Sequence, residues 1–236
     1  MLARMKTNAL LFIACTSIAQ VALAARPFVT DDARLTTAGG CQVESWTRQY
    51  QNSHEYWVLP ACNPWGNLEF TAGGARAGND GQAQTSDFLF QLKTLVRELR
   101  PNDWGWGVGI GRVNHPGSVA GPNLFGNTYV YLPASFSFRD DNIVMHVNVG
   151  MLKDRLTRDK RTTLGVGGEF RLNPRLLGIT EVYGDDANKP YYQVGARYHI
   201  IQDRFQIDTT LGGQTSEGRK ARWLSFGLRF TPDRFL

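Results

Sequence analysis

The chain has 236 residues, of which 42% are hydrophobic and 20% charged, and its formal net charge is +5. A mean hydropathy of −0.31 excludes a bundle of membrane-spanning helices, and so small a positive charge gives no indication of nucleic-acid binding. The 25 glycines and the aromatic content (6 Trp, 8 Tyr and 13 Phe) instead favour strands, tight turns and membrane interfaces.

The first residues have the pattern of a cleavable export signal. Arg4 and Lys6 form a basic start, residues 9–14 an apolar core, and residues 22–24 an Ala-Leu-Ala cleavage site. The apolar core is too short to cross a bilayer as a helix. No run of 18 apolar residues follows the cleavage site, so we expect the exported chain to have no transmembrane helix.

The division of the chain depends on where this signal is cut. Cys15 leaves one alternative, a lipoprotein lipidated at that residue, although the residues around it fit that pattern poorly. We expect residues 1–24 to be a signal peptide, residues 25–40 an N-terminal periplasmic segment, and residues 41–236 one β-barrel domain.

Apolar and polar residues alternate with a period of two along most of the remaining chain. This pattern is typical of strands with one apolar face. The runs are about 9–12 residues long, the length that a tilted strand needs to cross a bilayer. We count about twelve strands. They include a hairpin over 41–62 and runs at 67–77, 85–97, 104–111, 127–138, 142–152, 162–172, 190–201, 204–212 and 222–230.

The lengths of the connections alternate as well. Short polar turns at 101–103, 140–141, 173–174 and 202–203 separate longer loops near 77–85, 113–126, 153–161, 184–189 and 213–221. Transmembrane barrels have short turns on the periplasmic rim and long loops outside. We therefore predict an all-β, antiparallel, up-and-down barrel in the bacterial outer membrane, with both termini periplasmic. The alternative is a soluble periplasmic sandwich or barrel, whose apolar faces would point inward.

The predicted mature start carries a resemblance to a known family. It reads Arg-Pro-Phe-Val-Thr-Asp-Asp-Ala over 26–33 and Gly-Gly-Cys-Gln-Val-Glu over 39–44. This resembles the start of outer-membrane β-barrel proteins of the meta-pathway of phenol degradation type, in which R-P-x-x-T-D-D precedes a glycine and a Q-x-E strand. Cys41 departs from that pattern. The resemblance implies an outer-membrane barrel that passes small apolar or aromatic molecules.

Two cysteines remain after the signal peptide. If Gln51 and Asn52 form a two-residue hairpin turn, three pairs face each other: Cys41 with Cys62, Trp46 with Trp57, and Arg48 with Glu55. Directly opposed strand residues are within disulfide range. We predict a disulfide at the base of this hairpin, with two free buried thiols as the alternative. The spacing of Cys and His predicts no metal site.

The faces opposite the apolar ones would line the barrel interior. The predicted lining residues are Lys93, His146, Asn148, Glu169, Arg171, Gln193, Arg197, His199 and Asp208. A turn at 202–203 would place Arg197 opposite Asp208 and His199 opposite Gln206. These side chains form either a structural polar network filling a narrow barrel or a permeation pathway. Loops or the N-terminal segment could plug that pathway.

Two aromatic features have more than one interpretation. Residues 104–111 alternate glycine with Trp, Val and Ile, so the glycine face would allow a bend or form one wall of a solute path. Trp104, Trp106 and Trp223 suit the aromatic girdle at a membrane interface.

The sequence favours a passive channel or transporter for small molecules over three alternatives: a structural barrel without a pore, an outer-membrane lipid hydrolase, or a soluble binding protein. A hydrolase would need a serine, a histidine and an acid close together, and only Ser135 is expected to face a histidine, His146. We therefore expect no enzyme activity, catalytic residues, cofactor or nucleic-acid partner. The expected partners are outer-membrane lipids, the barrel-assembly machinery and a small solute.

Overall fold

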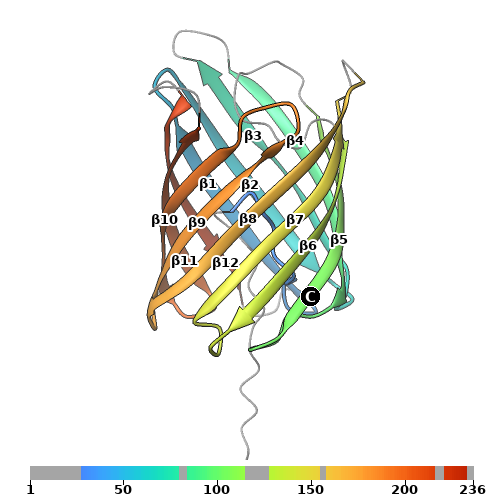
Figure 1. Ribbon diagram of the computed structural model, residues 1–236, viewed down its shortest axis with the longest axis vertical. Coiled ribbons are helices and arrows are strands. Elements are labelled where there is room, and N and C mark those ends of the chain that lie inside the picture. Colours follow the sequence, from blue (N-terminus) through green and yellow to red (C-terminus); the bar gives the residue numbers. More distant parts are fainter. Residues whose placement is uncertain (1–27, 80–83, 115–127, 155–157, 216–220, 233–236) are drawn as a thin grey trace, which may run out of the picture.

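The computed structural model shows a closed antiparallel barrel of twelve strands (Figure 1). It describes residues 28–79, 84–114, 128–154, 158–215 and 221–232, so the predicted signal peptide lies outside the described residues. Each strand pairs with its neighbours in sequence, and β1 pairs with β12 to close the barrel. The strands are β1 (Gly40–Gln49), β2 (Ser53–Asn63), β3 (Glu69–Asn79), β4 (Thr85–Arg97), β5 (Trp104–Asn114), β6 (Thr128–Phe138), β7 (Ile143–Lys153), β8 (Lys160–Asn173), β9 (Leu176–Asp185), β10 (Tyr191–Ile201), β11 (Phe205–Gln214) and β12 (Trp223–Phe230).

The outer face of the barrel is apolar and the inner face is polar. On β4, the outward Phe88 is 60% exposed, whereas the inward Lys93 is 2% exposed. The same alternation holds along β6, β7 and β10. No helix among the described residues is long and apolar enough to cross a membrane. The fold predicted from the sequence is therefore confirmed, and the opposite polarity, expected of a soluble barrel, is not observed.

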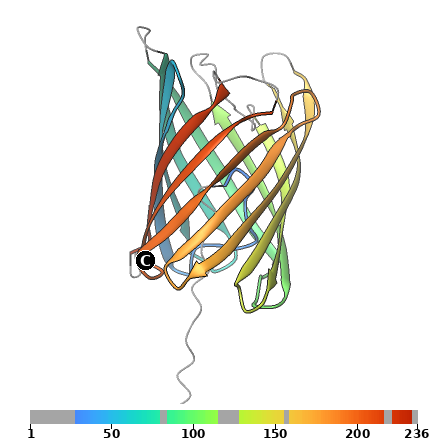
Figure 2. The ribbon, with the colours of Figure 1, turned by 60° about the vertical axis from the view of Figure 1, so that its left-hand side comes forward.

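The two rims of the barrel differ in their connections (Figure 2). The rim that we call the turn rim carries the connections from β2 to β3, β4 to β5, β6 to β7, β8 to β9 and β10 to β11, and β12 ends there. The shortest of these lies between Asn173 and Leu176. The opposite rim, the loop rim, carries the others, the longest between Asn114 and Thr128. The alternation of lengths is incomplete, because the connection from β1 to β2 at the loop rim is also short.

The described residues before β1, 28–39, run inside the barrel, where Figure 1 shows them behind the front strands. We call residues 28–39 the plug. Thr30, Asp32, Ala33, Leu35 and Thr36 are each at most 4% exposed. The sequence predicts an N-terminal periplasmic segment over residues 25–40 that could plug the barrel. Residues 28–39 lie inside the barrel, where the inner wall supplies polar partners for their backbone and charges.

The glycine-rich strand β5 turns its glycines inward. A Cβ at Gly109 would lie 2.2 Å from the Tyr131 ring, and one at Gly111 would lie 2.4 Å from the Tyr129 ring. The neighbouring strand β6 thus lays two tyrosine rings over a wall that has no side chains. The glycine stripe makes room for these rings, rather than forming an open wall.

The first hairpin has the predicted register. Cys41 pairs with Cys62 and the two form a disulfide. Trp46 and Trp57 stack with ring centroids 5.5 Å apart, and the backbone N–H of Tyr50 donates to the Ser53 carbonyl across the turn (2.9 Å). The predicted disulfide is confirmed, and it joins the ends of β1 and β2 at the turn rim.

Replacing Cys41 and Cys62 together with alanine should lower the stability of the barrel. The disulfide closes a loop with a sequence separation of 21, and the chain-entropy model gives such a loop about 3 kcal/mol. Urea unfolding in lipid vesicles measures the effect. An unchanged unfolding midpoint, or two alkylatable thiols in the unreduced native protein, would contradict it.

Candidate functional site

One end of the contact between plug and wall centres on Asp31. Its carboxylate accepts a hydrogen bond from the Lys93 ammonium (2.8 Å) and another from the Tyr131 hydroxyl. Lys93 also lies 3.6 Å from Asp32. The Asn148 side chain forms two hydrogen bonds with the backbone of Asp31. Its amide oxygen accepts from the Asp31 N–H, and its amide nitrogen donates to the Asp31 carbonyl. Strands β4, β6 and β7 therefore all hold Asp31, and β4 contacts Asp32 as well.

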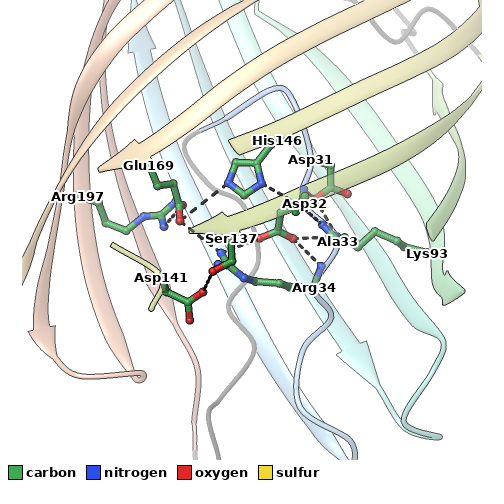
Figure 3. Close-up of polar contacts among 11 residues, drawn as sticks. Asp31, Asp32, Ala33, Arg34, Lys93, Ser137, Asp141, His146, Glu169 and Arg197 are labelled. Carbon is green, nitrogen blue, oxygen red and sulfur yellow. Dashed lines mark hydrogen bonds and ion pairs between the residues drawn. The ribbon is translucent and has the colours of Figure 1, made fainter. Parts of the chain in front are cut away.

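A second centre forms around Glu169 on β8. Its carboxylate accepts a hydrogen bond from Arg197 of the wall (2.7 Å) and lies 3.4 Å from the Arg34 guanidinium of the plug. Arg34 in turn lies 3.6 Å from Asp32. Figure 3 shows Asp32 between Lys93 and Arg34, so that the two centres form one continuous network. Arg197, Lys93, Asp32 and Glu169 are all buried.

The network balances its charges. Lys93, Arg34 and Arg197 are the cations, and Asp31, Asp32 and Glu169 are the carboxylates. Burial raises the pKa of Asp32, which lies in the plug outside the strands, to about 7, although Lys93 and Arg34 oppose this shift. Buried charges need such partners because removal from water is costly for each of them.

The wall also satisfies the backbone of the plug. Glu181 accepts hydrogen bonds from the backbone N–H groups of Val29 (3.0 Å) and Thr30. Glu69 accepts from both the backbone N–H and the hydroxyl of Thr36, each at 2.7 Å. Two carboxylates from distant strands thus replace the water that an irregular buried segment would otherwise need.

Ser135 and His146 lie together, as the sequence analysis expected. The Ser135 hydroxyl is 2.8 Å from His146 Nδ1, and His146 Nε2 is 4.0 Å from the Glu169 carboxylate. The Ser135 hydroxyl also accepts the backbone N–H of Ala33 (2.9 Å), and both side chains are 0% exposed. A nucleophile needs access to a substrate. Here the plug covers Ser135, so Ser135 and His146 hold the plug in this structure.

The structure buries most of the residues predicted to line the interior. Those buried in the barrel are Lys93, His146, Asn148, Glu169, Gln193, Arg197, His199 and Asp208. The ninth, Arg171, is exposed near the turn rim, where its guanidinium donates to the Asp141 carbonyl (3.4 Å). Arg197 faces Asp208 and His199 faces Gln206, as expected. No group of three His, Cys, Asp or Glu residues within the described ranges is placed to hold a metal ion.

Trp223 does not lie in the aromatic girdle, where its sequence context had suggested it. The side chain is 2% exposed and lies inside the barrel. The inward position of Trp223 could have been predicted from the alternation along β12. Leu224, Phe226 and Leu228 point outward, so Trp223 has the parity of the inner face. Trp104 is 40% exposed on the outer face, at the turn rim.

Comparison with known proteins places the chain in a family. Residues 11–231 match the family model described as uncharacterised conserved protein UCP029691, so the chain belongs to this family. No curated protein matches it in sequence.

Several solved structures share the fold. The KdgM porin has a TM-score of 0.65 and 9% sequence identity, over 81% of this chain and 99% of its own. The COG4313 outer membrane channel from Pseudomonas putida F1 has a TM-score of 0.60 and 10% identity, over 85% and 98%. The NanC porin has a TM-score of 0.55 and 11% identity, over 80% and 98%. The chain therefore has the fold of outer-membrane porins.

Changing Glu169 to glutamine should destabilise the barrel strongly. The substitution keeps the shape but leaves two buried guanidinium groups, Arg34 and Arg197, without their shared carboxylate. Removing one partner of a buried pair costs about 3–5 kcal/mol. Urea unfolding in vesicles, followed by tryptophan fluorescence, measures the change.

Asp103→Asn is the matched control. It breaks the Arg97–Asp103 pair, which has the same distance of 2.7 Å but lies at an exposed turn, where ion pairs add little to stability. We expect its unfolding midpoint to stay at the wild-type value. Equal midpoints for the Glu169 and Asp103 variants would contradict the importance of the buried network.

Proposed function

We propose that this member of the family is an outer-membrane channel for small solutes and that the plug closes it. The observation that carries the proposal is the plug itself, a segment outside the barrel strands that lies in the interior and is held by ion pairs and hydrogen bonds to the wall. The fold shared with porins and channels supports the proposal.

The outer surface supports a membrane location. Large apolar side chains such as Phe90, Val194 and Phe226 are at least 50% exposed on the outer face, and comparable side chains point outward from most of the other strands. A soluble protein rarely exposes so much contiguous apolar surface, whereas lipid covers such a band in a transmembrane barrel. In the proposed orientation the turn rim faces the periplasm and the loop rim faces the exterior.

The barrel wall is shaped to receive the plug. A Cβ at Gly165 would lie 2.2 Å from the Thr30 hydroxyl, and one at Gly167 would lie 2.9 Å from the Phe28 ring. Both glycines lie on β8 and face inward. In a barrel filled by its own wall, side chains would occupy these positions. Their absence leaves space that Thr30 and Phe28 of the plug occupy.

The attachment of the plug is polar, and this favours release. Many of its buried contacts are ion pairs and hydrogen bonds. The apolar contacts are small: Ala33 and Leu35 pack on Leu95, Val29 packs on Tyr183 and Trp223, and the Phe28 ring meets His146 edge-on. Water can replace polar contacts when a segment moves out, whereas a large apolar contact would hold it in place. The C-terminal end of the plug is tied to the barrel by its connection to β1 at Gly40 and by hydrogen bonds between Thr36 and Gly39 of the plug and Asn63 and Glu69 of the wall.

Conductance across a planar bilayer tests the channel. We expect refolded wild-type protein to give rare, brief openings. Deletion of residues 28–36 should give sustained openings, because it removes the plug and leaves the wall charges facing water. Lys93→Met, which removes the cation that holds Asp31 and Asp32, should increase the open fraction without shortening the chain.

Asp103→Asn serves as the control in the same experiment, since its ion pair lies outside the interior, and it should conduct like the wild type. If the deletion variant inserts into the bilayer but stays silent, the protein is not a channel. If the wild type already conducts as much as the deletion variant, the plug does not close it.

Membrane fractionation tests the location. We expect the expressed full chain to sediment with the outer membrane and to resist extraction by carbonate, since lipid covers its apolar outer face. Recovery in the soluble periplasmic fraction would contradict the proposal. An outer-membrane porin of the same cell marks the fraction.

A further inference from the structure

Four aromatic side chains gather inside the barrel near the loop rim. They come from the turn after β1 and from β9, β10 and β12. Tyr183 stacks on Tyr191 with centroids 5.6 Å apart, Tyr191 lies 6.2 Å from Trp223, and Tyr50 lies 5.9 Å from Trp223. We call Tyr50, Tyr183, Tyr191 and Trp223 the aromatic cluster. Ring faces so arranged offer apolar contact and edges to another planar group.

A cation completes the cluster. The Arg48 guanidinium lies 5.1 Å from the centroid of the Trp223 ring, within the range of a cation–π contact. One of its terminal nitrogens, Nη1, is 3.1 Å from the Glu55 carboxylate. Glu55 is thus the carboxylate that neutralises Arg48, and the contact is made through Nη1.

Several buried donors in the cluster have no acceptor. Among the residues that the structure describes, no partner is found for the Tyr183 hydroxyl, Trp223 Nε1 or Arg48 Nε. The Tyr50 hydroxyl has the Arg48 side chain as its partner, and because arginine only donates, the Tyr50 O–H also lacks an acceptor. Tyr183, Trp223 and Arg48 are at most 8% exposed. Burial raises the pKa of Tyr50, which lies in the turn outside the strands, so its hydroxyl keeps its proton. A buried donor without an acceptor is costly, and four in one place point to an acceptor that the protein does not supply.

The wall fixes the position of the tryptophan ring. Gly212 on β11 pairs with Trp223 on β12, and a Cβ at Gly212 would lie 2.3 Å from the indole. Only glycine lets the ring lie flat against the wall there. The ring orientation is thus determined by the backbone beneath it, as expected of a preorganised site.

The cluster lies against the outer end of the plug. Val29 packs against it, and the backbone N–H of Val29 donates to Glu181, two residues before Tyr183 on β9. A solute that enters from the loop rim reaches the cluster before it reaches the ion-pair network. A molecule bound there would contact the plug directly.

We propose that the aromatic cluster and Arg48 bind a small planar carboxylate, such as an aromatic acid, at the outer entrance of the channel. This inference rests on the proposed function, because it names the class of solute that the proposed channel binds. The rings would contact the planar body, and the unpartnered donors would bind the carboxylate oxygens. A carboxylate accepts hydrogen bonds and donates none, which matches a site whose unpartnered groups are donors. A sugar would bring hydroxyl donors as well.

Calorimetric titration of the refolded full chain in detergent with sodium benzoate tests the site. We expect saturable binding of one benzoate per barrel, with weaker binding of benzyl alcohol, which lacks the carboxylate, and of acetate, which lacks the ring. Tyr183→Phe removes one donor and should weaken benzoate binding about tenfold, the usual effect of losing one hydrogen bond to a charged group.

Tyr129→Phe is the matched control, because Tyr129 is also buried in the interior but its hydroxyl donates to Gln91 (2.8 Å), away from the cluster. It should bind benzoate like the wild type. Absence of saturable binding would overturn the inference and indicate that water satisfies these donors. Equal binding of all three probes, or unchanged binding by Tyr183→Phe, would also overturn it.

The titration does not depend on conduction. Benzoate binding by a chain whose plug deletion stays silent in a bilayer would support the site and contradict the channel. Conduction by the deletion variant without benzoate binding would support the channel and contradict the site.

Discussion

The ion-pair network between the plug and the wall is the interaction on which the rest of the structure depends. Lys93, Glu169 and Arg197 project into the interior from three strands, and each is nearly or fully buried. Without the plug, water would have to solvate these groups, because charges removed from water need partners. Asp31, Asp32 and Arg34 supply the opposite charges. Plug and wall therefore complement each other electrostatically.

The same network explains how one barrel can be both stable and closable. Ion pairs and hydrogen bonds specify a single position for the plug, since each carboxylate has its own cation or backbone amide. They do not require an apolar surface that would be costly to expose. The glycines of β8 give the plug room, and the aromatic cluster borders its outer end. Specific placement and reversible closure thus have the same physical cause.

Local patterns in the sequence predicted the barrel well. The two-residue turn at Gln51 and Asn52 fixed the register of the first hairpin, and with it the Cys41–Cys62 disulfide, because antiparallel pairing follows directly from the turn. Arg197 and Asp208 were paired by the same reasoning. Such contacts lie between neighbours in the chain, where alternation and turn length determine which side chains meet.

Contacts across the interior could not be predicted in this way. Asp31 meets Lys93 over 62 residues and Val29 meets Glu181 over 152, and no periodic pattern connects such positions. Thr-Asp-Asp-Ala-Arg in the plug was visible only as a motif, without its partners. Arg171 was misjudged for a different reason: it has the parity of the inner face but lies at the end of β8, where the rim exposes it.

The accessibility of the plug in the membrane-embedded protein tests the central claim most directly. Ala33 is 0% exposed between Ser135 and Leu95, whereas Thr37 in the same segment is exposed. Cysteine introduced at each position can be labelled with a small maleimide, since both native cysteines of the described chain are in the disulfide. A much slower rate for Ala33→Cys than for Thr37→Cys is the result that the structure predicts. Equal, fast rates would show that the segment does not occupy the barrel.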